Sequence, residues 1–387
     1  MEEFKMVAKT MYGLEEILAN ELQTLGAKNI NRLTRAVEFT GDMKMLYKAN
    51  YCLRTALCIL KPIVFFTAKD ENELYSNIFK VKWEKYMNPD GTLIIDSSVS
   101  SHTFKHSLFV AQKTKDAICD HFRKYFNVRP NVDKKDPDLK IDIHIFENDV
   151  TISLDSSGEK LFKRGYRRQT GLAPINEVTA AGLIQLTGWK ADSNFLDPMC
   201  GSGTIAIEAA MYAMNIPAQY YRHSFAFQHW SEYNSVDWKY VRQEADNQIR
   251  DFNYEIWASD ISQDALNIAQ TNITFTKLHK DIHLLLSPME EGKKPEGKTI
   301  VITNPPYGER LEVDDVVALY ERMGDTFKKF YDGCTVWVLS SDIFALKRIG
   351  LKPTRRIEVF NGNLECRFFK FEIYKGSKKD LYIDSPK

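Results

Sequence analysis

Hydrophobic positions in residues 1–64 follow strand spacing first and helical spacing next. The segment FKMVAK predicts a strand, and a helix follows because apolar residues recur every three or four positions up to Gly26: Leu14, Ile17, Leu18, Leu22 and Leu25. RAVEFTG predicts another strand, and a second helical stretch is predicted up to Leu60, shortly before Pro62. This order predicts a small α+β region.

Residues 65–157 carry a second alternation of strand and helix patterns. LIIDSSVSS predicts a strand, and residues 108–126 predict an amphipathic helix. KIDIHIF alternates strictly, with Ile141, Ile143 and Ile145 on one face. A short turn joins it to VTISLD, so the two segments predict a hairpin.

From residue 158 onward, short apolar runs alternate with helical segments. The predicted strands are NFLD, EIWASD, IHLLL, TIVITN and TVWVLS. Strands separated by helices predict a mostly parallel, doubly wound α/β sheet. RRIEVF and RFFKFEIY flank Asn361-Gly362-Asn363, which predicts an antiparallel hairpin that closes the sheet.

Composition narrows the class of protein. The chain has 387 residues, 44% hydrophobic and 27% charged, as expected for a soluble protein of two or three domains. Its 52 Lys+Arg balance 52 Asp+Glu, so a nucleic-acid partner must be argued from local basic clusters. We expect no signal peptide and no membrane span, because no long apolar run occurs. Six cysteines without a CxxC pair favour a reducing, cytoplasmic location.

The segment Asp197-Pro-Met-Cys-Gly201-Ser-Gly203-Thr204 joins NFLD to a predicted helix. Its glycines let the backbone approach a ligand, and the first N–H groups of the helix are free to bind one. A dinucleotide site, a methyltransferase cofactor site and a plain turn all fit a GxG pair. Two details favour S-adenosylmethionine. Asp197 lies at the strand end, four residues before Gly201, and the acidic residue that a dinucleotide site keeps about 20 residues after the glycines is missing.

The next acidic residue at a strand end is Asp260, in IWASDIS. Its carboxylate can accept hydrogen bonds from both ribose hydroxyls of the cofactor. It can also cap the helix predicted to start near Ser262, and the two roles are compatible.

Asn304-Pro305-Pro306-Tyr307 ends the strand TIVITN and carries the strongest chemical signal. An exocyclic amine on a nucleobase is a weak nucleophile, because its lone pair is delocalised into the ring, so its N–H groups need acceptors. The side-chain oxygen of Asn304 and the carbonyl of Pro305 are suitable acceptors. The prolines fix the turn, and Tyr307 offers a face on which a flipped base can stack. A rigid turn without function is the alternative.

DPMCGSGT, SDIS and NPPYGERL, preceded by KRGYRRQTGLAPINE, resemble the THUMP-domain class I RNA methyltransferases. The branch that they resemble is related to the N-terminal, N2-guanine methyltransferase half of the fused enzyme RlmL. The resemblance covers nearly the whole chain. It implies a ferredoxin-like region over 1–64, a THUMP RNA-binding domain over 65–157, and a Rossmann-like class I methyltransferase domain over 158–387.

The resemblance also implies roles for particular residues. Four residues would surround the methionine part of S-adenosylmethionine: Asp197, Gly201, Gly203 and Thr204. Asp260 would hold the ribose, with Ile261, Met289 and Asn304 also at the cofactor, and residues 304–307 would hold the target base. The family usually has an acidic residue for the adenine amine where this chain has Pro288, so the adenine contact stays open between Met289, a backbone group and Glu290.

Other polar and aromatic clusters have weaker signals. The basic tract Lys163, Arg164, Tyr166, Arg167 and Arg168 predicts RNA contact, with a solvated linker as the alternative. His279 and His283 have zinc-compatible spacing, but no third ligand accompanies them, so we predict no metal. Trp230 and Trp238 are predicted to belong to a core or to cover the pocket.

The leading hypothesis is methylation of the exocyclic 2-amino group of a guanine in structured RNA, with 23S ribosomal RNA favoured by the resemblance. Three alternatives stay open: a transfer-RNA guanine-N2 methyltransferase, a DNA adenine-N6 methyltransferase, and a non-catalytic RNA-binding assembly factor. Membrane and metal partners are not expected, and the sequence does not fix the oligomeric state.

Overall fold

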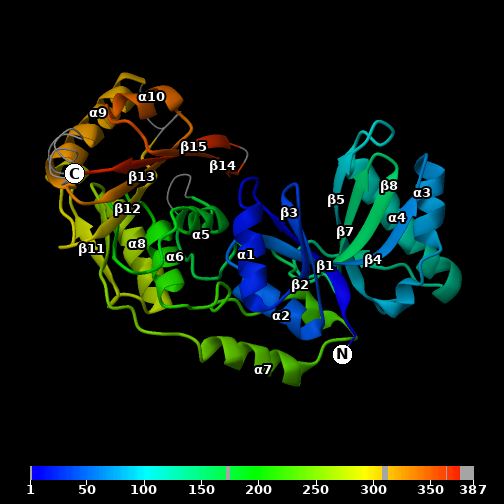
Figure 1. Ribbon diagram of the computed structural model, residues 1–387. Helices are drawn as coiled ribbons and strands as arrows, with labels where there is room; N and C mark the ends of the chain where they lie inside the picture. Colours follow the sequence, from blue (N-terminus) through cyan, green and yellow to red (C-terminus); the bar gives the residue numbers. More distant parts are fainter. Residues whose placement is uncertain (1, 171–174, 307–312, 363, 375–387) are drawn as a thin grey trace, which may run out of the picture. The chain divides into compact units, whose positions relative to one another are not determined.

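The computed structural model describes residues 2–170, 175–306, 313–362 and 364–374, and the chain divides into two compact units (Figure 1). The first comprises Met1–Thr10, Leu18–Leu161 and His223–Glu244, and the second comprises Met11–Ile17, Phe162–Arg222 and Ala245–Lys387. Each unit contains one large sheet. None of the described helices is both long and apolar enough to cross a membrane.

The first unit is built on an eight-stranded sheet in the order β2-β3-β1-β4-β8-β7-β5-β6. Figure 1 shows α3 and α4 side by side along one face of β5, β7 and β8. Ile141, Ile143 and Ile145 of β7 are fully buried, as their alternation predicted. The elements up to residue 161 are β1 (Phe4–Thr10), α1 (Glu15–Leu25), β2 (Lys28–Leu33), β3 (Ala36–Gly41), α2 (Met43–Cys52), β4 (Ala56–Thr67), α3 (Glu71–Phe79), η1 (Trp83–Lys85), β5 (Thr92–Ser100), α4 (Ser107–Phe126), β6 (Asn131–Val132), β7 (Leu139–Phe146) and β8 (Asp149–Asp155).

The segment after α2 is a strand, so the predicted helix up to Leu60 is wrong beyond Cys52. β4 runs through Pro62 and pairs with β1 on one side and β8 on the other. Its aromatic and β-branched residues suit a strand, and Pro62 lies where the register with β8 shifts, a position that tolerates the missing N–H.

Residues 223–244 interrupt the second unit in sequence but pack within the first. They contain η2 (Ala226–His229) and most of α7 (Ser235–Asp246). Trp238 packs edge-on against Tyr51 with ring centroids 5.6 Å apart, and Phe227 lies 4.7 Å from Tyr47. Trp238 and Trp230 are buried, so they are core residues, one of the roles predicted for them.

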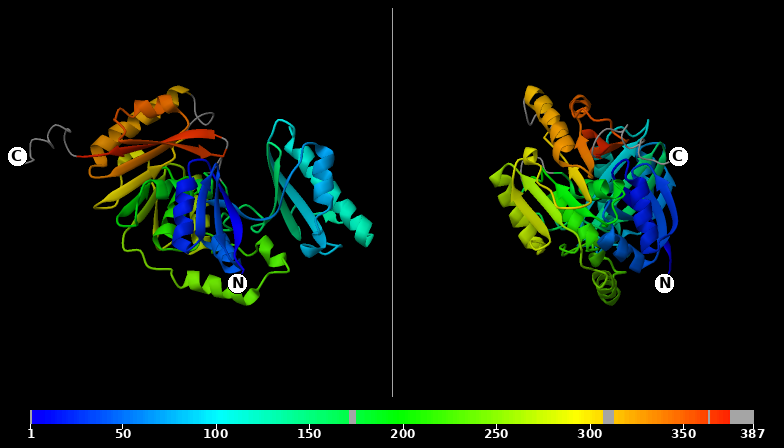
Figure 2. Two further views of the ribbon diagram at one scale, coloured as in Figure 1. Left: turned by 45° about the vertical axis from the view of Figure 1, so that its right-hand side comes forward. Right: turned by 60° about the vertical axis from the view of Figure 1, so that its left-hand side comes forward.

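The second unit is built on a seven-stranded sheet in the order β11-β10-β9-β12-β13-β15-β14. The first five strands are parallel, and β15 and β14 (red in Figure 2) close the sheet as an antiparallel hairpin. The remaining elements are α5 (Glu177–Leu186), β9 (Asn194–Asp197), α6 (Thr204–Ala213), β10 (Ile256–Asp260), α8 (Gln263–Thr276), β11 (Ile282–Leu286), η3 (Met289–Glu291), β12 (Thr299–Thr303), α9 (Val313–Phe330), β13 (Thr335–Ser340), α10 (Ile343–Arg348), β14 (Arg355–Asn361) and β15 (Leu364–Glu372).

Apolar side chains fill both faces of this sheet. Along β12, Ile300 and Ile302 belong to the core under α5, α6 and α8, whereas Val301 belongs to the core under α9 and α10. A strand buried on both faces reads as a continuous apolar run, which is the pattern of TIVIT. The predicted α/β fold with a terminal antiparallel hairpin is confirmed.

Candidate active site

A cavity of about 1010 Å³ opens at the carboxyl ends of the parallel strands. β9 has β10 on one side and β12 on the other, so the strand order reverses there, and ligands of such sheets bind at this point. The lining includes most of the predicted site residues: Asp197 at the end of β9 with Gly201 and Thr204 after it, Asp260 at the end of β10 with Ile261 after it, Met289 after β11, and Asn304 and Pro306 after β12. Residues far apart in sequence thus share one cavity.

Two glycines shape the loop between β9 and α6. Gly201 and Gly203 have positive φ angles of 52° and 79°, which glycine adopts without strain. A Cβ added to Gly203 would lie 3.2 Å from the Ala269 side chain, so this glycine also lets the loop pack closely on α8. Gly203 is the N-cap of α6 and is not in the described lining of the cavity.

The Asp260 carboxylate ties the ends of two strands together. One oxygen accepts the Gly201 N–H at 2.9 Å, and the other accepts the Ser262 N–H at 2.9 Å. Ser262, not Asp260, is the N-cap of α8, since its hydroxyl accepts the Ala265 N–H. A carboxylate offers about four lone-pair sites, so Asp260 retains capacity for ligand hydroxyls.

Asp197 is almost fully buried, and its carboxyl is incompletely satisfied. Oδ1 accepts the Met199 N–H at 3.3 Å, whereas Oδ2 has no hydrogen-bond partner among the described residues. Burial raises the pKa of Asp197 to about 8, and nearby Asp260 adds to the shift. A cationic group bound in the cavity would offset this cost, so the residues fit the ammonium end of an amino-acid-like cofactor.

Asn304 has the same property at the neighbouring strand end. Its Oδ1 is buried and makes no hydrogen bond within the described part of the chain. An unmet buried acceptor costs about 1–3 kcal/mol, so its retention beside a cavity indicates a ligand donor. Pro306 lines the cavity and Pro305 is buried next to it, while the predicted stacking residue Tyr307 lies outside the described residues.

Three regions of the chain match known families. The RMKL-like methyltransferase domain matches residues 164–370, the THUMP domain matches 68–155, and the RlmL ferredoxin-like domain matches 5–60. The chain belongs to the RMKL-like methyltransferase family. This confirms the predicted resemblance.

Relatives of this methyltransferase family match over nearly the whole chain. "Putative RNA methyltransferase slr0064" of Synechocystis is 34% identical over 94% of this chain and 95% of its own length. Ribosomal RNA large subunit methyltransferase K/L of Marinomonas is 33% identical over 96% of this chain but only 53% of its own length, so the chain spans about half of that relative. The crystal structure of SMU.472, "a putative methyltransferase complexed with SAH", matches with a TM-score of 0.85 and 30% identity, over 97% of this chain and 100% of the other.

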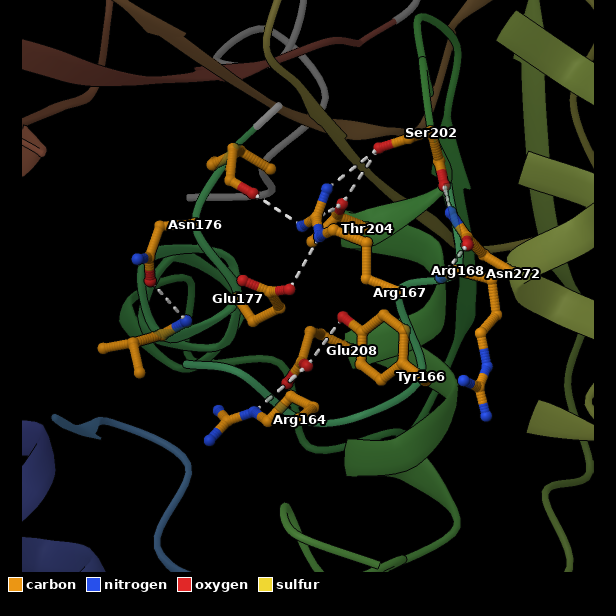
Figure 3. Close-up of polar contacts among 12 residues, drawn as sticks. Arg164, Tyr166, Arg167, Arg168, Asn176, Glu177, Ser202, Thr204, Glu208 and Asn272 are labelled. Atoms are coloured by element: carbon orange, nitrogen blue, oxygen red, sulfur yellow. Dashed lines mark hydrogen bonds and ion pairs between the residues drawn. The ribbon is translucent and has the colours of Figure 1, made fainter. Parts of the chain in front are cut away.

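The basic tract of this family member turns inward at two positions (Figure 3). Arg164 and Tyr166 are each 1% exposed, and both contact Glu208 of α6, Arg164 through Nε at 3.4 Å and Tyr166 through its hydroxyl at 3.0 Å. This burial argues against the predicted RNA contact of Arg164 and Tyr166, because neither side chain presents a surface to a ligand in this structure.

The other basic residues of the tract differ in exposure. Lys163 and Arg168 are exposed, and the Arg168 guanidinium lies 3.8 Å from the centre of the Phe275 ring. Arg167 is mostly buried and bonded to Glu177. RNA contact by Lys163, Arg167 and Arg168 stays a prediction.

Sequence reasoning missed three polar residues that hold this tract: Glu177, Glu208 and Asn272. A signal for Glu208 was available, because a glutamate inside the apolar helix TIAIEAAMYA demands a buried partner. No comparable signal marks Asn272. Among the described residues, no group of three metal-ligating side chains is close enough to hold an ion.

Proposed function

We propose that this chain is an S-adenosylmethionine-dependent methyltransferase that acts on the exocyclic 2-amino group of a guanine in structured RNA, with 23S ribosomal RNA as the favoured substrate. One observation carries the proposal: Asp197 and Asn304, at the ends of adjacent strands, line one cavity, and each has a buried acceptor that is unpaired among the described residues. A cationic cofactor end and an amine donor suit these two acceptors.

The cofactor is held by residues from three strand ends. Asp197 binds the ammonium group, and Asp260 accepts the ribose hydroxyls with its remaining lone pairs. Ile261 is 75% exposed and Met289 is buried, and these apolar side chains line the cavity as surfaces for the adenine ring. Bound S-adenosylmethionine supplies an electrophilic methyl group on a sulfonium.

Asn304 orients the amine. Its Oδ1 accepts one N–H of the guanine amine, and the Pro305 carbonyl accepts the other, so the nitrogen becomes pyramidal and its lone pair, withdrawn from the ring π system, points toward the methyl carbon. The new N–C bond forms as the C–S bond breaks, and the amine proton then passes to solvent. Most of the rate enhancement comes from alignment of the reacting atoms.

The N-terminal regions bind the RNA substrate. We assign 1–64 to the ferredoxin-like region, 65–157 to the THUMP domain and 158–387 to catalysis. The K/L relative of which this chain spans about half is named a ribosomal RNA methyltransferase, and slr0064 an RNA methyltransferase. Six free cysteines, five of them buried, suit a reducing cytoplasm, where ribosomal RNA is made in bacteria.

The substrate is tested with the purified chain and labelled S-adenosylmethionine. We expect N2-methylguanosine in unmodified 23S ribosomal RNA, identified by nucleoside mass spectrometry. Transfer RNA and duplex DNA serve as parallel substrates. Label in adenine of DNA, or in transfer RNA alone, would replace the proposed substrate, and label in none of the three would favour the assembly factor.

Affinity for S-adenosylhomocysteine (SAH) is expected to rise with pH up to about 8. Burial holds the pKa of Asp197 at about 8, so the free protein carries a neutral carboxyl at lower pH. Because the ammonium group of SAH favours the carboxylate, binding releases a proton, and the association constant rises by at most about tenfold per unit between pH 6 and 8. Calorimetry measures both the association constant and the number of protons released on binding. Asp197→Asn should bind weakly and lose this pH dependence, and a variant that retained it would contradict the assignment.

A further inference from the structure

Arg167 joins three segments of the second unit (Figure 3). Its guanidinium donates to the Glu177 carboxylate at 2.7 Å, to the Ile175 carbonyl at 3.0 Å and to Thr204 Oγ1 at 3.0 Å. A longer contact of 3.4 Å reaches Ser202 Oγ. The Arg167 and Glu177 side chains are only 14% and 6% exposed, so water does not compete strongly for these bonds.

Asn272 of α8 also binds the loop between β9 and α6, residues 198–203, which we call the cofactor loop. Its amide donates to the carbonyls of Ser202 and Gln169, both at 3.2 Å. Its oxygen accepts the Arg168 N–H at 2.9 Å. The side chains of Arg167 and Asn272 therefore join the basic tract to the cofactor loop.

The cofactor loop needs contacts from other segments to fix its backbone conformation. Gly201 and Gly203 restrict the backbone less than other residues do, so the loop sequence alone leaves many conformations open. The described lining of the cavity includes Ser202 and Thr204 but neither Arg167 nor Asn272. Any effect of Arg167 on a ligand in the cavity is then expected to pass through the lining residues that it bonds, which are Ser202 of this loop, Thr204 at its junction with α6, and Ile175.

We propose that Arg167 is a positioning residue that holds the cofactor loop in its binding conformation through Thr204 and Ser202. The inference rests on the proposed function for the identity of the ligand. It gives Arg167 of the basic tract a role in cofactor affinity through the loop.

The test compares Arg167→Lys with Arg348→Lys in the whole chain. Lysine keeps the charge opposite Glu177 but lacks the planar fork that reaches the loop, so we expect the Kd for SAH to rise about tenfold or more. The KM for S-adenosylmethionine should rise in parallel, with kcat at saturating cofactor nearly unchanged. Arg348→Lys is the matched control, because Arg348 also pairs with a glutamate but lies exposed and outside the described cavity lining, and its Kd should stay at the wild-type value.

Thr204→Val tests the same bond from the loop side and leaves the ion pair of Arg167 with Glu177 in place. If Arg167 acts through the threonine hydroxyl, Arg167→Lys will change the Kd much less in the Thr204→Val background. A Kd for Arg167→Lys within about twofold of wild type, or additive effects in the double variant, would overturn the inference. Wild-type protein that bound no SAH would instead overturn the proposed function, and the inference with it.

Discussion

Replacing Asn304 by alanine is expected to slow methyl transfer by about 10²–10³-fold and to leave SAH binding nearly unchanged. The buried Oδ1 of Asn304 lies beside the cavity and has no partner among the described residues. In the proposed reaction it accepts an N–H that becomes more acidic as the amine attacks, so the bond strengthens in the transition state. Single-turnover kinetics with saturating cofactor measures the loss.

Stability should respond differently from activity in the same variant. An unpaired buried acceptor is unfavourable by about 1–3 kcal/mol, so Asn304→Ala should not lower the thermal midpoint of the cofactor-free protein. Asn267→Ala, on the exposed surface of α8, makes the same side-chain change away from the cavity and should keep the wild-type rate. A rate for Asn304→Ala above about a tenth of wild type would contradict the assignment of Asn304 as an acceptor for the amine.

The sequence predicted the sheet of the second unit because its strands are short apolar runs separated by helical segments. NFLD, IHLLL and TVWVLS are apolar runs, and each lies at or within one residue of its observed bounds. The motifs that bear chemistry end such strands, and parallel strands present their carboxyl ends at one edge. Placement of Asp197, Asp260 and Asn304 around one cavity therefore follows from periodicity and chain order.

Contacts between distant segments were beyond this reasoning. The first part of β4, up to Leu60, was predicted as helix because local spacing does not show that β1 and β8 flank it. The basic tract read as a surface because four of its side chains are cationic, yet Arg164 finds a carboxylate in α6. Burial of a cation depends on a partner elsewhere in the sequence, and only the unusual position of Glu208 hinted at one.

The tract from Arg164 to Arg167 holds α6 at two levels. Arg167 bonds to Thr204, the first residue of the helix, and Arg164 and Tyr166 bond to Glu208 one turn further on. A helix that begins at the cofactor loop is thus fixed by a segment that precedes the whole sheet in sequence. Loss of the contacts that Glu208 makes with Arg164 and Tyr166 should affect stability more than chemistry, since Glu208 is not in the described lining of the cavity.

Replacing Glu208 by alanine is expected to lower the free energy of unfolding by about 3–5 kcal/mol. The side chains of Glu208 and Arg164 are both 0% exposed, and the carboxylate accepts from the Arg164 guanidinium and the Tyr166 hydroxyl. Alanine removes the counter-ion of a fully buried guanidinium and the acceptor of a buried hydroxyl, and it leaves a cavity. Denaturant unfolding of the full chain, followed by tryptophan fluorescence and circular dichroism, measures the change.

Glu321→Ala is the matched control, because Glu321 makes an exposed ion pair with Arg348 at 3.5 Å and should lose less than about 1 kcal/mol. A double variant tests whether the loss of stability in Glu208→Ala comes from the unpaired arginine, since an apolar pair can replace a buried ion pair at little cost in free energy. The double variant Arg164→Leu/Glu208→Leu should therefore be more stable than Glu208→Ala. Equal stabilities for Glu208→Ala and Glu321→Ala would show that α6 does not depend on the inward-facing arginine.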